Sequence, residues 1–366
     1  MSGKYDNETF EEFCGRLGGV ISDGHLSLCI ALGVRSGLFD VLIEHQGNPM
    51  TSVELAEAAG LKERYVREWL GAMTCSHIVD LDATGQRYHL PARRAGCFEA
   101  GNPAYGTTQL SLSVPILSEV FNNMSESIKA DGPRGLTFEA SKSFNEVEEN
   151  FTMKWYQDCL CQQFIPAYPE IQGMLERGIQ MLDLGCGRGV ATRTLAKQFP
   201  NSHFTGLDIR EENVKEATEA AEAMGLKNVE YVTCDATGMS AEWTNKFDYV
   251  FTFNVLHDTS RPDTILADVR RVLKKDGGRL SVVEFGSHSE HAMNIDSYPS
   301  AGMLYTISLF HCLPVSYQEE DSLGLGTLWG KDKVVEFLKQ CGFVVKSVSE
   351  VPMLPEAHFL CEVAQK

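Results

Sequence analysis

A glycine-rich segment in the second half of the chain constrains the fold more than any other feature. It reads Met181-Leu-Asp-Leu-Gly-Cys-Gly-Arg-Gly-Val190, an apolar stretch with one acid followed by three glycines at alternate positions. Residues 178–184 are predicted to form a short buried strand, and residues 190–198 a helix. The glycines therefore lie in a strand-to-helix turn, where the missing Cβ atoms let the backbone bend tightly and approach a ligand.

An acid beside this turn indicates which kind of ligand it binds. Asp183 stands two residues before Gly185, and Gly189 comes one residue earlier than the third glycine of the G-x-G-x-x-G pattern of nicotinamide-binding turns. An acid here repels the pyrophosphate of a dinucleotide, but it attracts a cofactor that carries an ammonium and a sulfonium group. S-adenosylmethionine (SAM) is such a cofactor.

The strands predicted after this turn supply further ligand groups. Asp208 follows Gly189 by about 20 residues, where a carboxylate can accept hydrogen bonds from both ribose hydroxyls. Asp235 ends the next strand and suits the amino group of an adenine. Together with residues 178–184, seven strands are predicted, the others at residues 204–208, 229–235, 249–254, 279–284, 343–351 and 358–363. With helices between most of them, the pattern predicts a doubly wound α/β domain with ligand groups at the carboxyl ends of its strands.

With these features, residues from about 150 to 366 resemble a class I SAM-dependent methyltransferase. The resemblance implies a seven-stranded, Rossmann-like enzyme domain in which the glycine turn holds the methionine portion of SAM, Asp208 the ribose and Asp235 the adenine. The cofactor-binding residues that it implies are Asp183, Gly185, Gly187, Gly189, Asp208, Ile209, Asp235, Ala236 and Asn254. A dinucleotide enzyme, or a domain of this fold that has lost its cofactor, is the alternative, because fold alone does not determine function.

The segment Asn254-Val-Leu-His-Asp258 at the end of the fourth predicted strand is the candidate for chemistry. An imidazole there can take the proton of a hydroxyl or thiol that attacks the methyl group. The segment resembles the His-Asp stretch of plant-type O-methyltransferases, which implies that His257 is the general base, next to Asp258. The tryptophan common after the Asp in that family is absent. A His257 that only caps or positions the loop is the alternative.

The first part of the chain has a different organisation. Helices are predicted at residues 10–44, 51–60 and 62–75, and a hairpin at residues 78–90 that turns at Thr84-Gly85. Together they resemble a winged helix. A winged helix also precedes the catalytic domain of plant-type and antibiotic-type small-molecule O-methyltransferases, where it mediates dimerisation and covers the substrate pocket.

The charges of this module bear on its alternative role, DNA binding. The candidate recognition helix carries three cations, Lys62, Arg64 and Arg67, whose charge is offset by Glu63 and Glu68. A helix with such balanced charge binds a phosphate backbone weakly. A SAM-sensing transcriptional regulator is therefore the second hypothesis, and a dimerising enzyme the first.

The predicted organisation has three parts. Residues 1–95 form a helical winged-helix dimerisation domain, residues 96–165 a helical connector and lid, and residues 166–366 the SAM-binding domain. Within the connector, the aromatic residues of segment 151–156 either close over the sulfonium by cation–π attraction or pack in the core.

The composition limits which class of molecule can be the methyl acceptor. The net charge of −18 repels nucleic acid and favours an apolar or aromatic small-molecule acceptor over an anionic one. Oxygen is the first choice for the accepting atom. A thiol already ionised, or an amine already neutral, needs no base and would make the enzyme an S- or N-methyltransferase that works by proximity.

The eleven scattered cysteines suit reduced thiols, and the N-terminus lacks the features of a signal peptide. We expect no apolar run long enough to span a bilayer, and therefore a cytoplasmic protein without a membrane partner. Cys159-x-Cys161 and His288-x-x-His291 lack a second pair of ligands at finger-like spacing, and no metal site is predicted.

Overall fold

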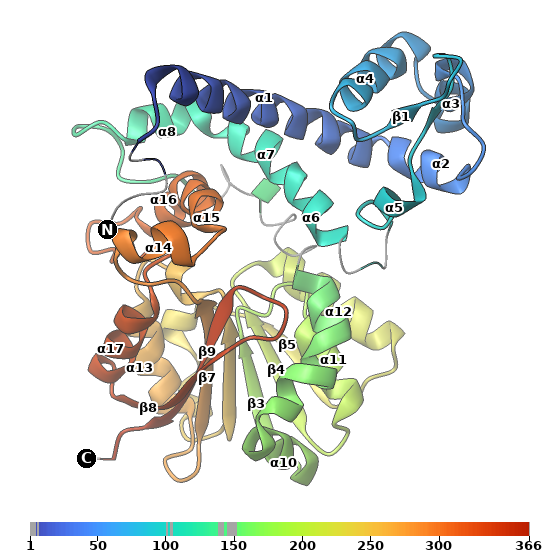
Figure 1. Cartoon of the computed structure of the whole chain (residues 1–366). Helices are drawn as coiled ribbons and strands as arrows, with labels where there is room; N and C mark the ends of the chain where they lie inside the picture. The colour runs from blue at the N-terminus through green and yellow to red at the C-terminus, as the bar shows by residue number, and fades with distance from the viewer. Residues whose placement is uncertain are drawn as a thin grey trace. The chain divides into compact units, whose positions relative to one another are not determined.

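The computed structural model of the chain describes residues 5, 7–99, 102, 105–137, 143–144 and 152–365. The chain divides into two compact units, residues 1–119 and residues 120–366, and each is described by itself (Figure 1). The boundaries predicted at residues 95 and 165 stay predictions.

The first unit is mainly helical and carries one small hairpin, as the sequence predicts. Its elements are α1 (Phe10–Arg35), α2 (Leu38–Glu44), α3 (Ser52–Ala59), α4 (Glu63–Cys75), β1 (Asp80–Leu81), β2 (Tyr88–His89), α5 (Ala92–Ala95), α6 (Tyr105–Gln109), η1 (Leu110–Leu112) and α7 (Ser113–Glu119). Helix α3 begins with a capping box, in which Thr51 and Glu54 each accept a hydrogen bond from the backbone N–H of the other. It ends at Gly60, whose φ of +67° is readily adopted by glycine.

Helix α1 presents many apolar side chains to solvent. It has 26 residues, and Phe10, Val20, Ile21 and Leu32 are each more than half exposed. By length and composition alone, it is apolar enough to cross a membrane, so the expectation that no segment reaches that length is wrong. That expectation considered only uninterrupted apolar runs, whereas charged residues such as Asp23 interrupt this helix without ending its apolar character.

A seven-stranded sheet forms the centre of the second unit. In chain order its strands are β3 (Gln180–Leu184), β4 (His203–Asp208), β5 (Val229–Thr233), β6 (Tyr249–Phe253), β7 (Arg279–Phe285), β8 (Phe343–Glu350) and β9 (Glu356–Val363). They lie side by side in the order β5-β4-β3-β6-β7-β9-β8, and only β9 runs antiparallel to its neighbours. The strand order reverses beside β3, so the loops after β3 and β6 diverge and leave a crevice at the carboxyl ends of the strands.

Two apolar layers cover the sheet, because neighbouring residues of each strand point to opposite faces. Met181 packs with α10 (Pro169–Arg177) and α11 (Val190–Gln198), whereas Leu182 packs with α13 (Pro262–Val272) and α17 (Lys331–Gln340). Helix α12 (Glu211–Ala223) packs beside β4 and β5. Figure 1 shows these helices on either side of the sheet. The predicted seven-stranded, doubly wound α/β fold is confirmed.

Two further helical regions flank the crevice, and each contains a π-helical segment. One is η3 (Tyr156–Phe164), continued by η4 (Ile165–Ala167). The other, after α14 (His291–Ser297), comprises α15 (Ala301–Ile307), the π-helical η8 (Ser308–Cys312) and α16 (Leu313–Ser316). Helix α8 (Phe121–Ser127) packs near η8 through stacked rings of Phe121 and Phe310. π-helical turns often occur at functional sites, and η8 brings Cys312 beside the loop after β6.

Candidate active site

The glycine turn between β3 and α11 is a close-packed backbone loop. Gly185, Gly187 and Gly189 all have positive φ angles. A Cβ atom at Gly185 would lie 2.5 Å from Val255, and one at Gly189 would lie 2.5 Å from the ring of Tyr231. Only glycine satisfies both the backbone angles and the space, so the turn keeps its backbone close to whatever binds above it.

Asp208 ends β4 and holds this turn in place. Its Oδ2 accepts a hydrogen bond from the backbone N–H of Gly187 at 2.9 Å. Its Oδ1 accepts from the backbone N–H of Arg210 at 3.0 Å and from Asn213 at 3.2 Å. The carboxylate is thus oriented by its surroundings before any ligand arrives, with lone pairs left for a pair of hydroxyl donors.

A cavity of about 850 Å³ opens above the glycine turn. Of the residues predicted to bind the cofactor, it is lined by Gly185, Gly187, Asp208, Ile209, Asp235, Ala236 and Asn254. It therefore brings together residues from the ends of four neighbouring strands, β5, β4, β3 and β6. Asp258 lines it as well, next to the candidate base.

Two predicted cofactor residues, Asp183 and Gly189, do not line this cavity. Asp183 is 4% exposed and accepts a hydrogen bond from the Thr192 hydroxyl at 2.5 Å. Burial raises the pKa of Asp183 to about 6, and the neighbouring Asp208 adds to the effect. Asp183 and Gly189 support the turn from behind, and their part in binding stays a prediction.

His257 lies in the short helix η7 (Leu256–Asp258) after β6 and is fully buried. Its Nδ1 lies 2.5 Å from Oε2 of Glu284, at the end of β7. Burial by itself lowers the pKa of His257, but the carboxylates of Glu284 and Asp258 outweigh it and hold the pKa well above its usual value. Glu284 thereby fixes the proton on Nδ1 and leaves Nε2 as the nitrogen that faces Asp258.

Glu284 was not singled out from the sequence, although it ends a predicted strand on the side where ligands bind. Besides His257, it accepts a hydrogen bond from the backbone N–H of Leu256 at 3.1 Å and one from the Trp329 ring nitrogen at 3.4 Å. These donors hold a buried carboxylate in one orientation. Its position at the carboxyl end of a strand was the only signal in the sequence.

Glu356 at the start of β9 is a second buried carboxyl group that the sequence did not reveal. It accepts a hydrogen bond from the Asn254 amide at 3.0 Å. Burial raises its pKa to about 7, although this hydrogen bond opposes the shift. Asn254 itself has a φ of +53°, and its side chain thus joins the cavity to Glu356.

Of the predicted aromatic segment, Tyr156 lines the cavity, whereas Trp155 is buried and donates a hydrogen bond to the carbonyl of Pro352. Trp155 is therefore part of the core. Phe151 lies outside the described residues.

The strand order, the glycine turn after β3 and the acids that end β4 and follow β5 define a class of protein, the Rossmann-like methyltransferases. Residues 175–339 match the family of methyltransferase domains, and residues 24–99 match the Rv2258c-like winged HTH domain. The predicted class, a SAM-dependent methyltransferase with an N-terminal winged-helix domain, is confirmed by these matches, and so is SAM as its cofactor.

Individual relatives agree with this class. A ubiquinone biosynthesis O-methyltransferase of Maricaulis maris is 32% identical over 100 residues, which cover 27% of this chain and 38% of that protein. The chain spans only 14% to 38% of the length of such curated relatives. Mitomycin 7-O-methyltransferase MmcR is similar in structure, with a TM-score of 0.72 at 19% identity, covering 96% of this chain and 97% of that one.

A second solved structure extends the comparison to a complex with cofactor. Human N-acetylserotonin methyltransferase, solved in complex with SAM, has a TM-score of 0.65 at 15% identity and covers 99% of this chain and 100% of that one. At such identities, the structural likeness shows the fold, and the acceptor of this chain is a separate question.

Proposed function

We propose that this chain transfers the methyl group of SAM to an oxygen atom of a small molecule, with His257 as the general base. The observation that carries the proposal is the buried pair of His257 and Glu284 next to Asp258, at the edge of the cavity above the glycine turn. A base whose tautomer is fixed, placed beside a nucleoside cavity, is what methylation of a hydroxyl requires.

The residues present fit SAM. Gly185 borders the cavity, and a Cβ there would meet Val255, which also lines it. Asp208 is already oriented for ribose hydroxyls. Asp235 accepts two hydrogen bonds from Thr237 through Oδ1, which fixes it beside Ala236, where the adenine is expected. When bound, SAM supplies an electrophilic methyl group on a positively charged sulfur.

This chain contributes orientation and proton transfer to the reaction. The turn and Asp208 hold the cofactor, and the acceptor hydroxyl loses its proton to Nε2 of the neutral form of His257 as its oxygen attacks the methyl carbon. Because the neighbouring carboxylates raise the pKa of His257, this neutral form becomes more abundant as pH rises. The charge that develops on the imidazole is stabilised by Glu284 on one side and Asp258 on the other, at 2.5 and 3.4 Å. The imidazole need not move, because Glu284 holds it throughout.

A small acceptor is supported by the size of the site and by the similar structures. The cavity of about 850 Å³ has to hold both the cofactor and the reacting end of the acceptor. Several of the similar structures are O-methyltransferases, and mitomycin is named as the substrate of one of them. Sulfur or nitrogen as the accepting atom is the alternative, and it would make the base dispensable.

Loss of the base is the direct test. His257→Ala is expected to lower methyl transfer by about a hundredfold or more, whereas calorimetry should show nearly unchanged SAM affinity, since other residues hold the cofactor. The exposed His291 provides a control as His291→Ala. The acceptor is sought by incubating the protein with SAM and a cell extract, followed by mass spectrometry of methylated products. Near-normal turnover of His257→Ala would move the acceptor to sulfur or nitrogen.

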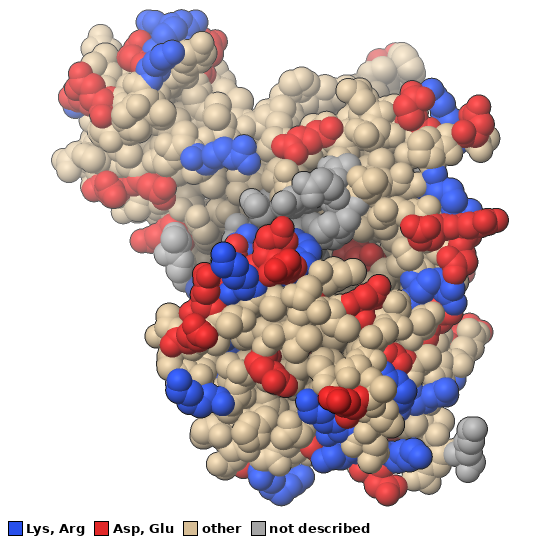
Figure 2. Space-filling view, turned by 180° about the vertical axis from the view of Figure 1, so that it is seen from behind, with Lys and Arg blue, Asp and Glu red and all other residues tan. Residues whose placement is uncertain are grey.

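The winged helix is proposed as a dimerisation module and not as a DNA reader. On α4, Arg64 pairs with Glu68 at 2.5 Å and Arg67 with Glu63 at 3.4 Å, so these cations are already neutralised. On the face drawn in Figure 2, positive and negative side chains lie interspersed. An electrophoretic shift with genomic DNA would favour a SAM-sensing regulator instead.

A cytoplasmic location is proposed from the cysteines. All eleven lie in the described part of the chain and are thiols. Such a set persists in a reducing compartment. Fractionation of the cells that make the protein tests this, and recovery with membranes would point to the apolar helix α1.

A further inference from the structure

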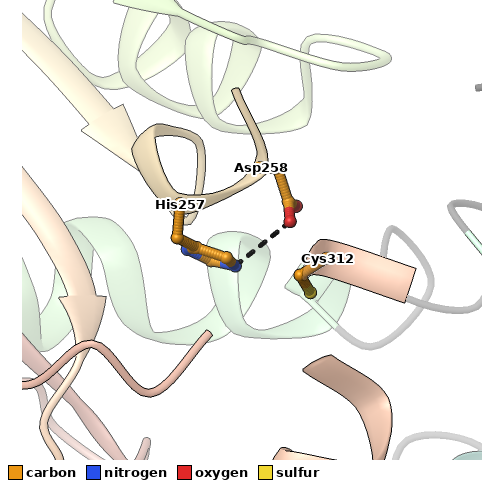
Figure 3. A group of neighbouring side chains, drawn as sticks. All are labelled: His257, Asp258 and Cys312. Atoms are coloured by element: carbon orange, nitrogen blue, oxygen red, sulfur yellow. Dashed lines mark ion pairs between the residues drawn. The ribbon is translucent and has the colours of Figure 1, made fainter. Parts of the chain in front are cut away.

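We infer that His257, Asp258 and Cys312 form a binding site for one divalent cation of the zinc class, and that the cation switches off the base. One ligand atom from each residue lies within 4.8 Å of the others. Figure 3 shows the three side chains pointing toward one another, two from the loop after β6 and one from the facing segment η8. The sequence predicts no metal site, because Cys312 is distant in the chain from the His-Asp pair.

The distances suit a tetrahedral ion. Nε2 of His257 lies 3.4 Å from Oδ1 of Asp258. With zinc bonds of about 2.0 Å to nitrogen and oxygen, the edge between two such ligands of a tetrahedron is about 3.3 Å. The sulfur of Cys312 requires an edge of about 3.6 Å with its longer bond, so a movement of about 1 Å completes the set.

Two of the ligand atoms are buried polar atoms that meet few partners. In the part of the chain that the structure describes, Nε2 of His257 faces only Oδ1 of Asp258, at 3.4 Å, and the thiol of Cys312, and neither Nε2 nor Oδ1 forms a hydrogen bond with a group outside this cluster. His257 is fully buried, so water does not satisfy it. A buried polar group without a good hydrogen bond costs free energy unless another group binds it. A cation binds a nitrogen lone pair and a carboxylate oxygen together.

The surroundings resemble those of known metal-binding imidazoles. A metal-ligating histidine usually donates its other ring N–H to a carboxylate, and Glu284 accepts that bond from Nδ1 of His257 at 2.5 Å. Leu256 and Trp329 hold Glu284 in turn. The donor set of imidazole, thiolate and carboxylate favours zinc over magnesium or calcium, which prefer oxygen ligands.

An ion can reach this site and retain one open position. Asp258 lines the cavity above the glycine turn, and its side chain is 21% exposed, so the site meets solvent on that side. On binding, the thiol proton of Cys312 and, where the imidazole is protonated, the proton on Nε2 of His257 are released to solvent, and the ion takes the lone pair of Nε2. The fourth position is left for water, as in other sites with three protein ligands.

The consequence for activity rests on the proposed function. The same nitrogen cannot both bind an ion and accept the proton of the acceptor. Zinc is therefore expected to lower methyl transfer at least tenfold at the concentration at which it occupies the site, and a chelator to restore it.

Cobalt provides a direct readout of binding that does not depend on activity. The full-length protein is expected to bind one equivalent of Co²⁺ with a near-ultraviolet sulfur-to-cobalt charge-transfer band, and Zn²⁺ should displace it. Cys312→Ser should lose the band, and Asp258→Asn should weaken Zn²⁺ binding at least tenfold. Cys159→Ser is the matched control, because Cys159 is another buried thiol, and it should retain the band.

Circular dichroism and SAM affinity show whether each variant is folded. A wild-type protein without the band, or a Cys312→Ser variant with the same band, would overturn the site. If zinc binds through Cys312 but does not lower turnover, His257 is not a ligand of the ion, and that part of the proposal is wrong. Absence of methyl transfer to any acceptor in the metal-free protein counts against the proposed function only, because the cobalt spectrum is read without turnover.

Discussion

The imidazole of His257 and the carboxylate of Glu284 are 2.5 Å apart, and solvent reaches neither side chain. The two residues are 27 positions apart in the chain and meet because β6 and β7 are parallel neighbours whose carboxyl ends lie side by side. The pair sets which nitrogen of His257 faces Asp258, a residue that lines the cavity.

Glu284→Gln tests this relationship. The variant keeps the size of the side chain and one of the two acceptor oxygens, which receive the hydrogen bonds of Leu256 and Trp329 separately, but it loses the charge that stabilises the imidazolium. The turnover number is expected to fall about 10- to 100-fold, while the KM for SAM changes little. Glu350→Gln on the exposed side of β8 is the control. A change confined to the KM for SAM would contradict a role through His257.

The Asp208→Ala substitution should weaken the binding of SAM and of S-adenosylhomocysteine to a similar extent. A charged acceptor for two hydroxyls contributes about 1.5 to 3 kcal/mol, which corresponds to about a 10- to 150-fold loss of affinity measured by calorimetry. Asp208→Asn, which can still accept from Gly187, should lose less. Unchanged affinity in a folded Asp208→Ala variant would remove Asp208 from the binding site.

The stability of the protein without cofactor should depend on pH through Asp183. Its pKa in the folded state is about 6, above the usual 3.8, so the folded protein binds this proton more tightly than the unfolded chain. Stability therefore falls as pH rises from about 4 to 6, by about 2 to 3 kcal/mol in all. In Asp183→Asn this component is absent. The difference in Tm between variant and wild type should shift in favour of the variant from pH 4 to pH 7, and a constant difference would refute the assignment.

The proposed dimer should depend on the apolar side of α1. Val20 and Ile21 are 61% and 55% exposed, and a second copy could bury them. Sedimentation is expected to give twice the 40.5 kDa of one chain. The double substitution of Val20 and Ile21 by Asp should produce the monomer, whereas Tyr65→Asp on α4 should not. If the wild-type protein is a monomer at micromolar concentration, a second copy does not cover the apolar side chains of α1, and the proposed dimer is contradicted.

The sequence alone determined the strands, the glycine turn and the acids that end β4 and follow β5. Residues 190–198 were predicted as a helix and form α11 with the same bounds, and residues 249–254 were predicted as a strand and form β6 within one residue. These features are local, because alternation of buried residues, glycines with positive φ and N-terminal caps act over a few neighbouring positions. They were enough to indicate a nucleoside cavity.

Only the tertiary structure decided what surrounds His257. The sequence placed an imidazole at the end of a strand, but it did not show that Glu284 from the next strand fixes Nδ1, nor that η8 brings Cys312 to the side of Nε2. Nor did it show that the side chain of Asp183, which it assigned to the cofactor, accepts a hydrogen bond from Thr192 behind the turn. Such relationships arise from strand order and from which side of a loop faces the core, and these follow from packing between segments far apart in the chain.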